Sequence, residues 1–98
     1  MQNLFSYYYK NPSFVHKLSE VISEYKCRVM QRAVKVGADV LLTGDDYANR
    51  KAPLMSPRQF KEFVLPYLRK AVETSKKLGV PFIKHTDGNL WPIIDMIV

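Results

Sequence analysis

The chain is short of cysteine, of long apolar runs and of clustered charge, and each shortage excludes a class of protein. Cys27 is the only cysteine among 98 residues, which excludes an internal disulfide and a cysteine-rich zinc site. A reducing, cytoplasmic compartment is therefore expected. No stretch of about 18 uncharged apolar residues occurs, so no membrane contact through a spanning helix is expected. The first residues lack the basic and apolar regions of a signal peptide.

Basic residues are in excess but are not concentrated. Fifteen Lys and Arg against nine Asp and Glu give a formal net charge of +6, which would suit a nucleic acid or an anionic substrate. The basic residues are spread along the helix faces and interleaved with Glu20, Glu24, Glu62 and Glu73, and no run of five occurs. We therefore expect no nucleic-acid binding, because a compact basic patch is missing. The apolar fraction of 47% is that of a globular chain.

The first half of the chain predicts a loop, a helix and a strand. Residues 1–11 show no clear period and are expected to form an N-terminal loop. An N-cap at Asn11 and helical spacing of apolar residues predict a helix over 12–36, followed by a strand over 38–43. The stripe expected to be buried consists of Phe14, Val15, Leu18, Val21, Ile22, Tyr25, Val29, Ala33 and Val36.

The second half repeats the pattern after a long loop, residues 44–55. Ser56 and Gln59 have the spacing of a capping box and predict the start of a helix over 57–78. Pro66 inside that helix is expected to kink it, because proline lacks the backbone N–H. Short apolar runs predict a second strand over 80–84, and a third helix begins at Leu90.

The order helix–strand–helix–strand–helix predicts an α/β fold with two parallel strands joined by a right-handed crossover. Two parallel strands do not make a stable sheet alone, because such sheets are covered on both faces. Residues 1–98 are therefore expected to form one segment of a larger α/β protein. The alternative is a small domain that oligomerises to cover its strand edges.

Polar residues follow both strands. Asp45 and Asp46 come after the first, and His85 and Asp87 come after the second. Because the carboxyl ends of neighbouring parallel strands meet at one edge, we expect these four side chains to converge. Tyr47 is a further candidate substrate contact.

The residue types of this edge leave several kinds of chemistry open. His85 and Asp87 are candidate ligands of a metal, because imidazole and carboxylate both bind divalent cations. They also suit contact with a polar substrate or proton transfer. Asp45 and Asp46 suit acid/base work or the binding of pyrrole or amine N–H groups. Arg50 suits a substrate carboxylate. The structural alternative for Asp87 is a turn-forming or helix-capping role.

Four stretches together carry a family resemblance. They are Gly37-Ala38-Asp39-Val40, Gly44-Asp45-Asp46, Met55-Ser56-Pro57 with Phe60-Lys61-Glu62-Phe63-Val64-Leu65-Pro66-Tyr67, and His85-Thr86-Asp87-Gly88-Asn89. Nearly all of residues 12–98 resembles the uroporphyrinogen decarboxylase family, which includes the decarboxylase of haem biosynthesis and corrinoid-dependent methyltransferases. The resemblance implies a partial (β/α)8 barrel with its site at the C-terminal rim.

The resemblance also implies partners and cofactors. In the decarboxylase branch, the Asp45-Asp46 turn contacts a tetrapyrrole substrate and no cofactor is needed. In the methyltransferase branch the substrate is a methylated compound, His85 occupies the position of a zinc ligand, and a cysteine is usual where Asp87 stands. The arginines and aspartate tied to decarboxylation lie upstream in the family, so this chain is expected to be inactive alone. A homo-oligomer or a missing complementary chain is expected to complete it.

Overall fold

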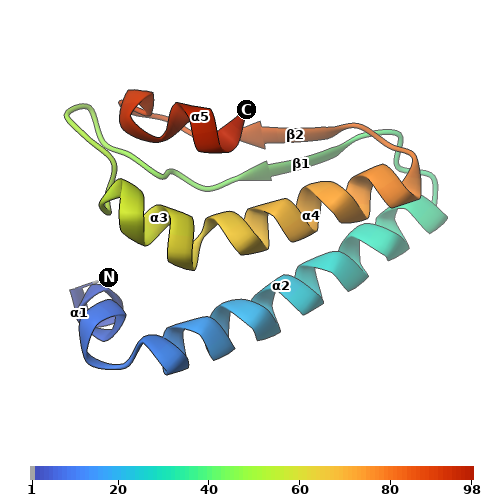
Figure 1. Ribbon diagram of the computed structural model, residues 1–98. Coiled ribbons are helices and arrows are strands. Elements are labelled where there is room, and N and C mark those ends of the chain that lie inside the picture. Colours follow the sequence, from blue (N-terminus) through green and yellow to red (C-terminus); the bar gives the residue numbers. More distant parts are fainter. Residues whose placement is uncertain (1) are drawn as a thin grey trace.

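The fold is a two-stranded parallel sheet with helices packed against it (Figure 1). The computed structural model describes residues 2–98. Its elements are α1 (Gln2–Lys10), α2 (Pro12–Lys35), β1 (Leu41–Gly44), α3 (Pro57–Phe63), α4 (Leu65–Leu78), β2 (Phe82–His85), the 3₁₀-helix η1 (Trp91–Ile93) and α5 (Ile94–Ile97). None of the helices in this described range is long and apolar enough to cross a bilayer.

The predicted parallel pairing of the two strands is confirmed. β1 and β2 are neighbours, in a register that runs from Leu41 opposite Phe82 to Gly44 opposite His85. Both strands therefore end at the same edge of the sheet. The polar turns that follow the strands start side by side, as the crossover predicts.

The expected N-terminal loop over residues 1–11 is wrong, because a helix, α1, occupies Gln2–Lys10; Met1 lies outside the described residues. Aromatic rings from this helix pack onto later elements. The ring of Tyr7 lies 5.4 Å from that of Phe14, and the ring of Tyr8 lies 4.8 Å from that of Phe63. These tertiary contacts stabilise a helix whose own sequence pattern is weak.

The helix predicted over residues 12–36 is confirmed as α2, but only part of the expected stripe, Val15 and Ala33, is buried or partly buried. Asn11 caps it by accepting a hydrogen bond from the Phe14 N–H at 3.1 Å. Its fully buried residues are Val15, Ser23, Cys27 and Met30, on the side that packs against α4. The uncovered residues are Phe14, Leu18, Val21, Ile22, Tyr25, Val29 and Val36, which are 37–86% exposed.

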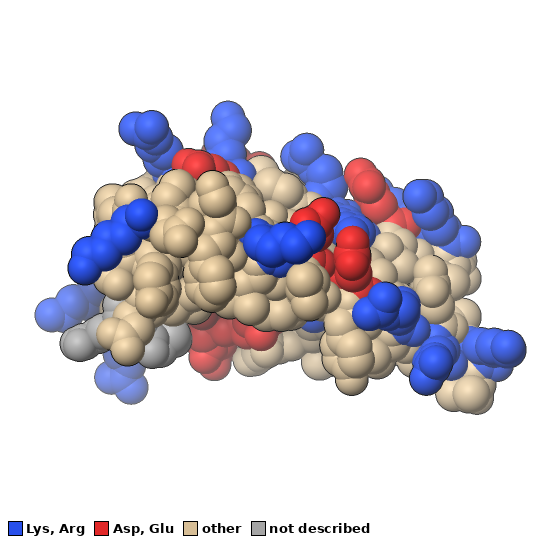
Figure 2. Space-filling model, turned by 90° about the horizontal axis from the view of Figure 1, so that it is seen from below, with Lys and Arg blue, Asp and Glu red and all other residues tan. Residues whose placement is uncertain are grey.

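These uncovered apolar residues form a second stripe along α2. Leu18, Ile22, Tyr25 and Val29 follow one another at spacings of four, three and four residues, the spacing of a helix–helix seam. Figure 2 looks onto this side of the molecule and shows broad tan areas between Lys and Arg side chains, with Asp and Glu side chains among them. The stripe is exposed because no element of residues 2–98 covers it.

The helix predicted over residues 57–78 is divided into α3 and α4. The capping box at its start is confirmed, with Ser56 Oγ accepting the Gln59 N–H at 3.2 Å and Gln59 Oε1 accepting the Ser56 N–H at 3.2 Å. Val64, two residues before Pro66, separates the two helices and has φ −116° and ψ −50°. Because Pro66 has no N–H, it fits the first turn of the new helix, and the expected kink becomes a break.

The core lies between the strands, α2 and α4. Met30, Leu41 and Ala71 are buried together, with Leu78 and Phe82 packed against them. Along each strand alternate side chains face this core. The other side of the sheet carries Leu42 and Ile83, which pair in register and are 65% and 48% exposed.

Candidate functional site

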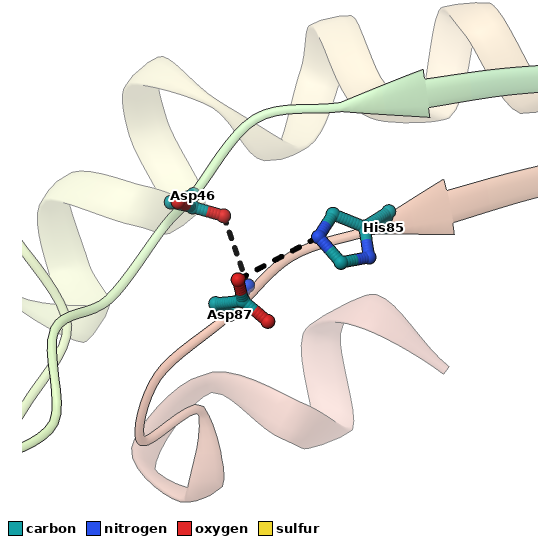
Figure 3. Close-up of side chains that lie close together, drawn as sticks. All are labelled: Asp46, His85 and Asp87. Atoms are coloured by element: carbon teal, nitrogen blue, oxygen red, sulfur yellow. Dashed lines mark hydrogen bonds and ion pairs between the residues drawn. The ribbon is translucent and has the colours of Figure 1, made fainter.

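Three of the predicted site residues meet at the carboxyl ends of the strands (Figure 3). Asp46 follows β1, His85 ends β2, and Asp87 lies two residues farther on. Their ligand atoms all lie within 4.8 Å of one another, and all three side chains are exposed. His85 Nε2 is 3.7 Å from Asp87 Oδ2. We refer to Asp46, His85 and Asp87 as the rim cluster.

Backbone hydrogen bonding holds the rim cluster together. Asp46 Oδ1 accepts the N–H of Asp87 at 3.0 Å, which joins the turn after β1 to the turn after β2. The N–H of Tyr47 donates to Thr86 Oγ1 at 3.0 Å across the same two turns. Asp46 therefore has one carboxylate oxygen engaged in positioning, while its second oxygen is available to a ligand.

Gly88 allows the two turns to approach each other closely. A Cβ at this position would lie 2.6 Å from the backbone of Ala48, and the φ of Gly88 is +95°, which disfavours other residues. Asn89 continues the contact by donating its backbone N–H to the Asn49 carbonyl at 2.8 Å. Its side chain also donates to the Lys51 carbonyl at 2.9 Å. The long loop after β1 is thus fastened to the turn after β2.

Asp45 does not join the rim cluster, although all four carboxylate and imidazole groups were expected to converge. Its Oδ2 lies 3.3 Å from Lys84 Nζ and 3.7 Å from Lys26 Nζ. Lys84 also donates to the Asp45 carbonyl at 2.9 Å. The side chain of Lys84 is only 8% exposed, and burial lowers its pKa while the nearby Asp45 carboxylate opposes that effect.

Tyr47 lies with Asp45 on the helix-covered side rather than with the rim cluster. Its ring contacts Phe60 edge to face at 5.1 Å, and Lys84 Nζ lies 4.4 Å from the ring centroid. Burial, followed by the negative charge of Asp45, raises the pKa of the Tyr47 hydroxyl to about 12. Tyr47 therefore keeps its proton at neutral pH and packs beneath the loop.

A groove next to the rim cluster contains the arginine that the sequence singled out. Arg50, Gly88, Asn89, Leu90, Trp91 and Ile94 line a space of about 560 Å³. Trp91 is 81% exposed, so its ring forms an accessible wall of this groove. Arg50 supplies a positive charge and Trp91 a flat apolar face, a combination suited to a planar ligand that carries carboxylates.

Sequence reasoning missed Lys84, Thr86 and Gly88 as residues that shape this edge. For Lys84 a signal was present, because a lysine inside an apolar strand needs a buried partner. Alternation along a strand also separates neighbouring residues onto opposite faces, which was the available signal that Asp45 and Asp46 would point apart. For Gly88 the Asp87-Gly88 pair was a turn signal, whereas Thr86 carried none, because its role depends on the loop that packs over it.

Comparison with known proteins assigns the chain to a family. A family model for uroporphyrinogen decarboxylase (URO-D) matches residues 1–98. The chain belongs to the uroporphyrinogen decarboxylase family. The resemblance seen in its sequence motifs is thereby confirmed over the whole chain.

Individual relatives within this family are distant. A uroporphyrinogen decarboxylase of Dictyostelium discoideum is 29% identical over 98 residues, which cover 98% of this chain and 26% of that protein. One from Thermus thermophilus is 25% identical over 88 residues, covering 90% and 25% respectively. One from Chlorobium luteolum is 35% identical over 72 residues, covering 69% and 18%. The chain thus spans about a quarter of these relatives' length or less. No solved structure matches the chain.

Proposed function

We propose that this chain forms part of the substrate-binding rim of a (β/α)8 barrel that decarboxylates a tetrapyrrole, and that it is inactive alone. The observation that carries the proposal is the meeting of Asp46, His85 and Asp87 at the carboxyl ends of two neighbouring parallel strands. Sites in barrels of this kind lie at that edge. Membership of the uroporphyrinogen decarboxylase family supports placing the substrate-binding site at the same edge of the sheet.

The rim cluster and the adjacent groove have complementary parts in this proposal. Carboxylates at Asp46 and Asp87 accept hydrogen bonds from pyrrole N–H groups, and His85 adds a polar contact beside them. Arg50 in the groove pairs with a substrate carboxylate, and Trp91 lies against the ring system. Asp45 and Tyr47 contribute by holding the loop through Lys84 rather than by direct contact.

The open face of the sheet supports completion by further strands. Leu42 and Ile83 lie side by side on it, and each strand has one unpaired edge. Apolar pairs of this kind are ordinarily covered in parallel sheets. In the proposal they belong to the barrel interior, and a second copy or a complementary chain supplies the remaining strands.

Binding of a tetrapyrrole polycarboxylate tests the proposal directly. The fluorescence of uroporphyrin is titrated with the intact chain, with Asp46→Asn, with Arg50→Met, and with Asp95→Asn as a matched control away from the rim. We expect saturable binding that weakens by about tenfold in the first two variants and is unchanged in the control. Binding that is unaffected by Asp46→Asn and Arg50→Met contradicts the proposed rim contacts.

A second candidate function is a divalent-cation site at the same cluster, favoured by the convergence of its ligand atoms within 4.8 Å. One imidazole and two carboxylates fit a divalent cation without any thiolate. Asp46, His85 and Asp87 would hold the ion, which would supply a Lewis acid to a bound substrate. Asp87 stands where the methyltransferase branch has a cysteine, so a site of lower zinc affinity is proposed.

Metal analysis separates this candidate from the first. Zn²⁺ and Mn²⁺ are titrated calorimetrically into the metal-free chain, His85→Ala and Asp87→Cys. A cation site predicts stoichiometric binding lost in His85→Ala, with Asp87→Cys shifting the preference toward Zn²⁺, because thiolate is the softer ligand. Binding that is absent or unchanged in His85→Ala contradicts the cation site.

A further inference from the structure

A cavity lies on the other side of the sheet from the rim cluster. It has a volume of about 190 Å³ and is lined by residues of all four helices α1 to α4 and of both strands. Thr43 and Phe82 face it from the strands, whereas Leu42 and Ile83 alternate with them and point to the open face. His85 shares the open face with Ile83. The cavity and the rim cluster are therefore separate places.

One wall of the cavity is polar and comes from a single face of α2. Ser19, Ser23 and Lys26 follow one another at spacings of four and three residues, so they lie in a row along the helix. Ser23 is only 5% exposed. Among residues 2–98 its hydroxyl makes no hydrogen bond. No buried side-chain polar atom in that range lacks a partner, so the Ser23 hydroxyl is not sealed off and opens into the cavity that Ser23 lines.

The charge beside this wall is positive. Lys26 Nζ lies 3.7 Å from Asp45 Oδ2, and Lys84 Nζ lies 3.3 Å from the same oxygen. Two ammonium groups thus share one carboxylate. The Lys26–Asp45 distance is longer than a hydrogen bond, so the ammonium of Lys26 keeps donors free for an anion that enters the cavity.

The opposite wall is apolar and the space is small. Phe63, Leu68 and Ala71 line it from α3 and α4. An apolar cavity of about 150 Å³ holds one benzene molecule, so the present space suits a single ring or a short branched chain.

We propose that this cavity binds a small monocarboxylic acid with one ring or a short branched chain. Lys26 and the hydroxyls of Ser19 and Ser23 hold the carboxylate. Phe63, Leu68 and Ala71 contact the apolar body. The site is independent of the rim cluster, because Thr43 and Phe82 place it on the helix-covered face.

Benzoate is the probe that tests this site on the whole chain. It is titrated into the ¹⁵N-labelled protein, and amide shifts at Ser19, Ser23 and Tyr47 are followed. We expect saturable shifts and a dissociation constant that rises about tenfold in Lys26→Met. Lys35→Met, on the same helix away from the cavity, serves as the matched control and keeps the wild-type constant. Benzyl alcohol, which has the ring but no charge, binds about tenfold more weakly.

Three outcomes of these titrations would overturn the site. They are the absence of saturable shifts, equal binding in Lys26→Met, and equal binding of benzyl alcohol. Amide dispersion shows whether each variant is folded, and Ser23→Ala provides a milder second variant with an expected loss of about threefold. Because the cavity is separate from the rim cluster, His85→Ala should bind benzoate as tightly as the wild type. Loss of benzoate binding in this variant would contradict the assignment of the cavity to the helix-covered face. Because the cavity and the rim cluster are separate, a failure to bind uroporphyrin would contradict the proposed function without changing the expected binding of benzoate.

Discussion

The two faces of the β1–β2 sheet differ more than any other two regions of the molecule. On the helix-covered face Leu41 is 8% exposed and packs with Met30 and Ala71. On the open face its neighbour Leu42 is 65% exposed, although the two residues are chemically identical. The core of residues 2–98 therefore lies on the covered face, while the apolar side chains of the open face remain in solvent.

The same contrast separates the polar residues that follow the strands. Asp45 turns toward the covered face and pairs with Lys26 and Lys84. Asp46 turns toward the rim cluster and stays exposed. The Asp45 carboxylate is paired with two lysine ammonium groups and holds the loop, whereas the Asp46 carboxylate beside His85 and Asp87 is available to a ligand. Two adjacent aspartates thus have different roles because the sheet has two different sides.

The largest expected effect comes from the matched pair Leu41→Ala and Leu42→Ala. Leu41→Ala leaves a cavity in the core and should lower the free energy of unfolding by about 2–5 kcal/mol. Leu42→Ala should change it by less than about 0.5 kcal/mol, because the side chain is already in solvent. Urea denaturation monitored by circular dichroism measures both. Equal losses of unfolding free energy in the two variants would contradict the difference in burial between the two faces.

The next effect concerns Gly88, where the two turns meet. Gly88→Ala places a methyl group 2.6 Å from the backbone of Ala48 and should cost about 1–3 kcal/mol through overpacking and positive φ. Gly37→Ala is the control, because its φ is +107° but no atom lies within 4 Å of the added Cβ. Thermal unfolding should therefore rank Gly88→Ala as the more damaging change. The reverse order contradicts the close approach of the loop.

A third prediction concerns association through the open face. Leu42→Lys with Ile83→Lys should weaken self-association by about tenfold, because charges would have to be buried between copies. Sedimentation velocity over a range of concentrations measures it. Tyr25→Lys on the uncovered stripe of α2 is the matched variant. If Tyr25→Lys weakens self-association more than the double variant does, the copies contact each other through α2, and the prediction for the open face of the sheet is wrong.

The last prediction concerns the pH dependence of stability that arises from Tyr47. Folding raises its pKa from 10.0 to about 12, so the folded state holds the proton more tightly than the unfolded state. The resulting stabilisation is complete below pH 10 and is lost as the pH rises toward about 12. The wild type should lose stability over this interval more steeply than Tyr47→Phe, as measured by urea denaturation. Parallel pH profiles would show that Tyr47 is in solvent.

Much of the architecture could be predicted from local signals. Asn11 and the Ser56–Gln59 pair marked the starts of α2 and α3, because a cap depends on residues close in sequence. The parallel pairing followed from the length of the connection between the strands. α1 was missed because its stability comes from contacts outside the helix, of Tyr7 with Phe14 and of Tyr8 with the distant Phe63.

The rim cluster was predicted in part. His85 and Asp87 were placed correctly beside Asp46, because strand ends determine where turns begin. The separation of Asp45 depended on Lys84 and Lys26, which reach it from other elements. The cavity beside Ser23 had no signal in the sequence, since a cavity is a relation among residues that are far apart along the chain.

The sequence by itself determined the family, the order of helices and strands, and the edge at which polar residues gather, because periodicity, caps and strand ends are local properties. Only the tertiary structure decided which of two apolar stripes on α2 is buried and which aspartate faces the rim. Both outcomes depend on neighbours brought together from distant parts of the chain, since burial is decided by what packs against a side chain.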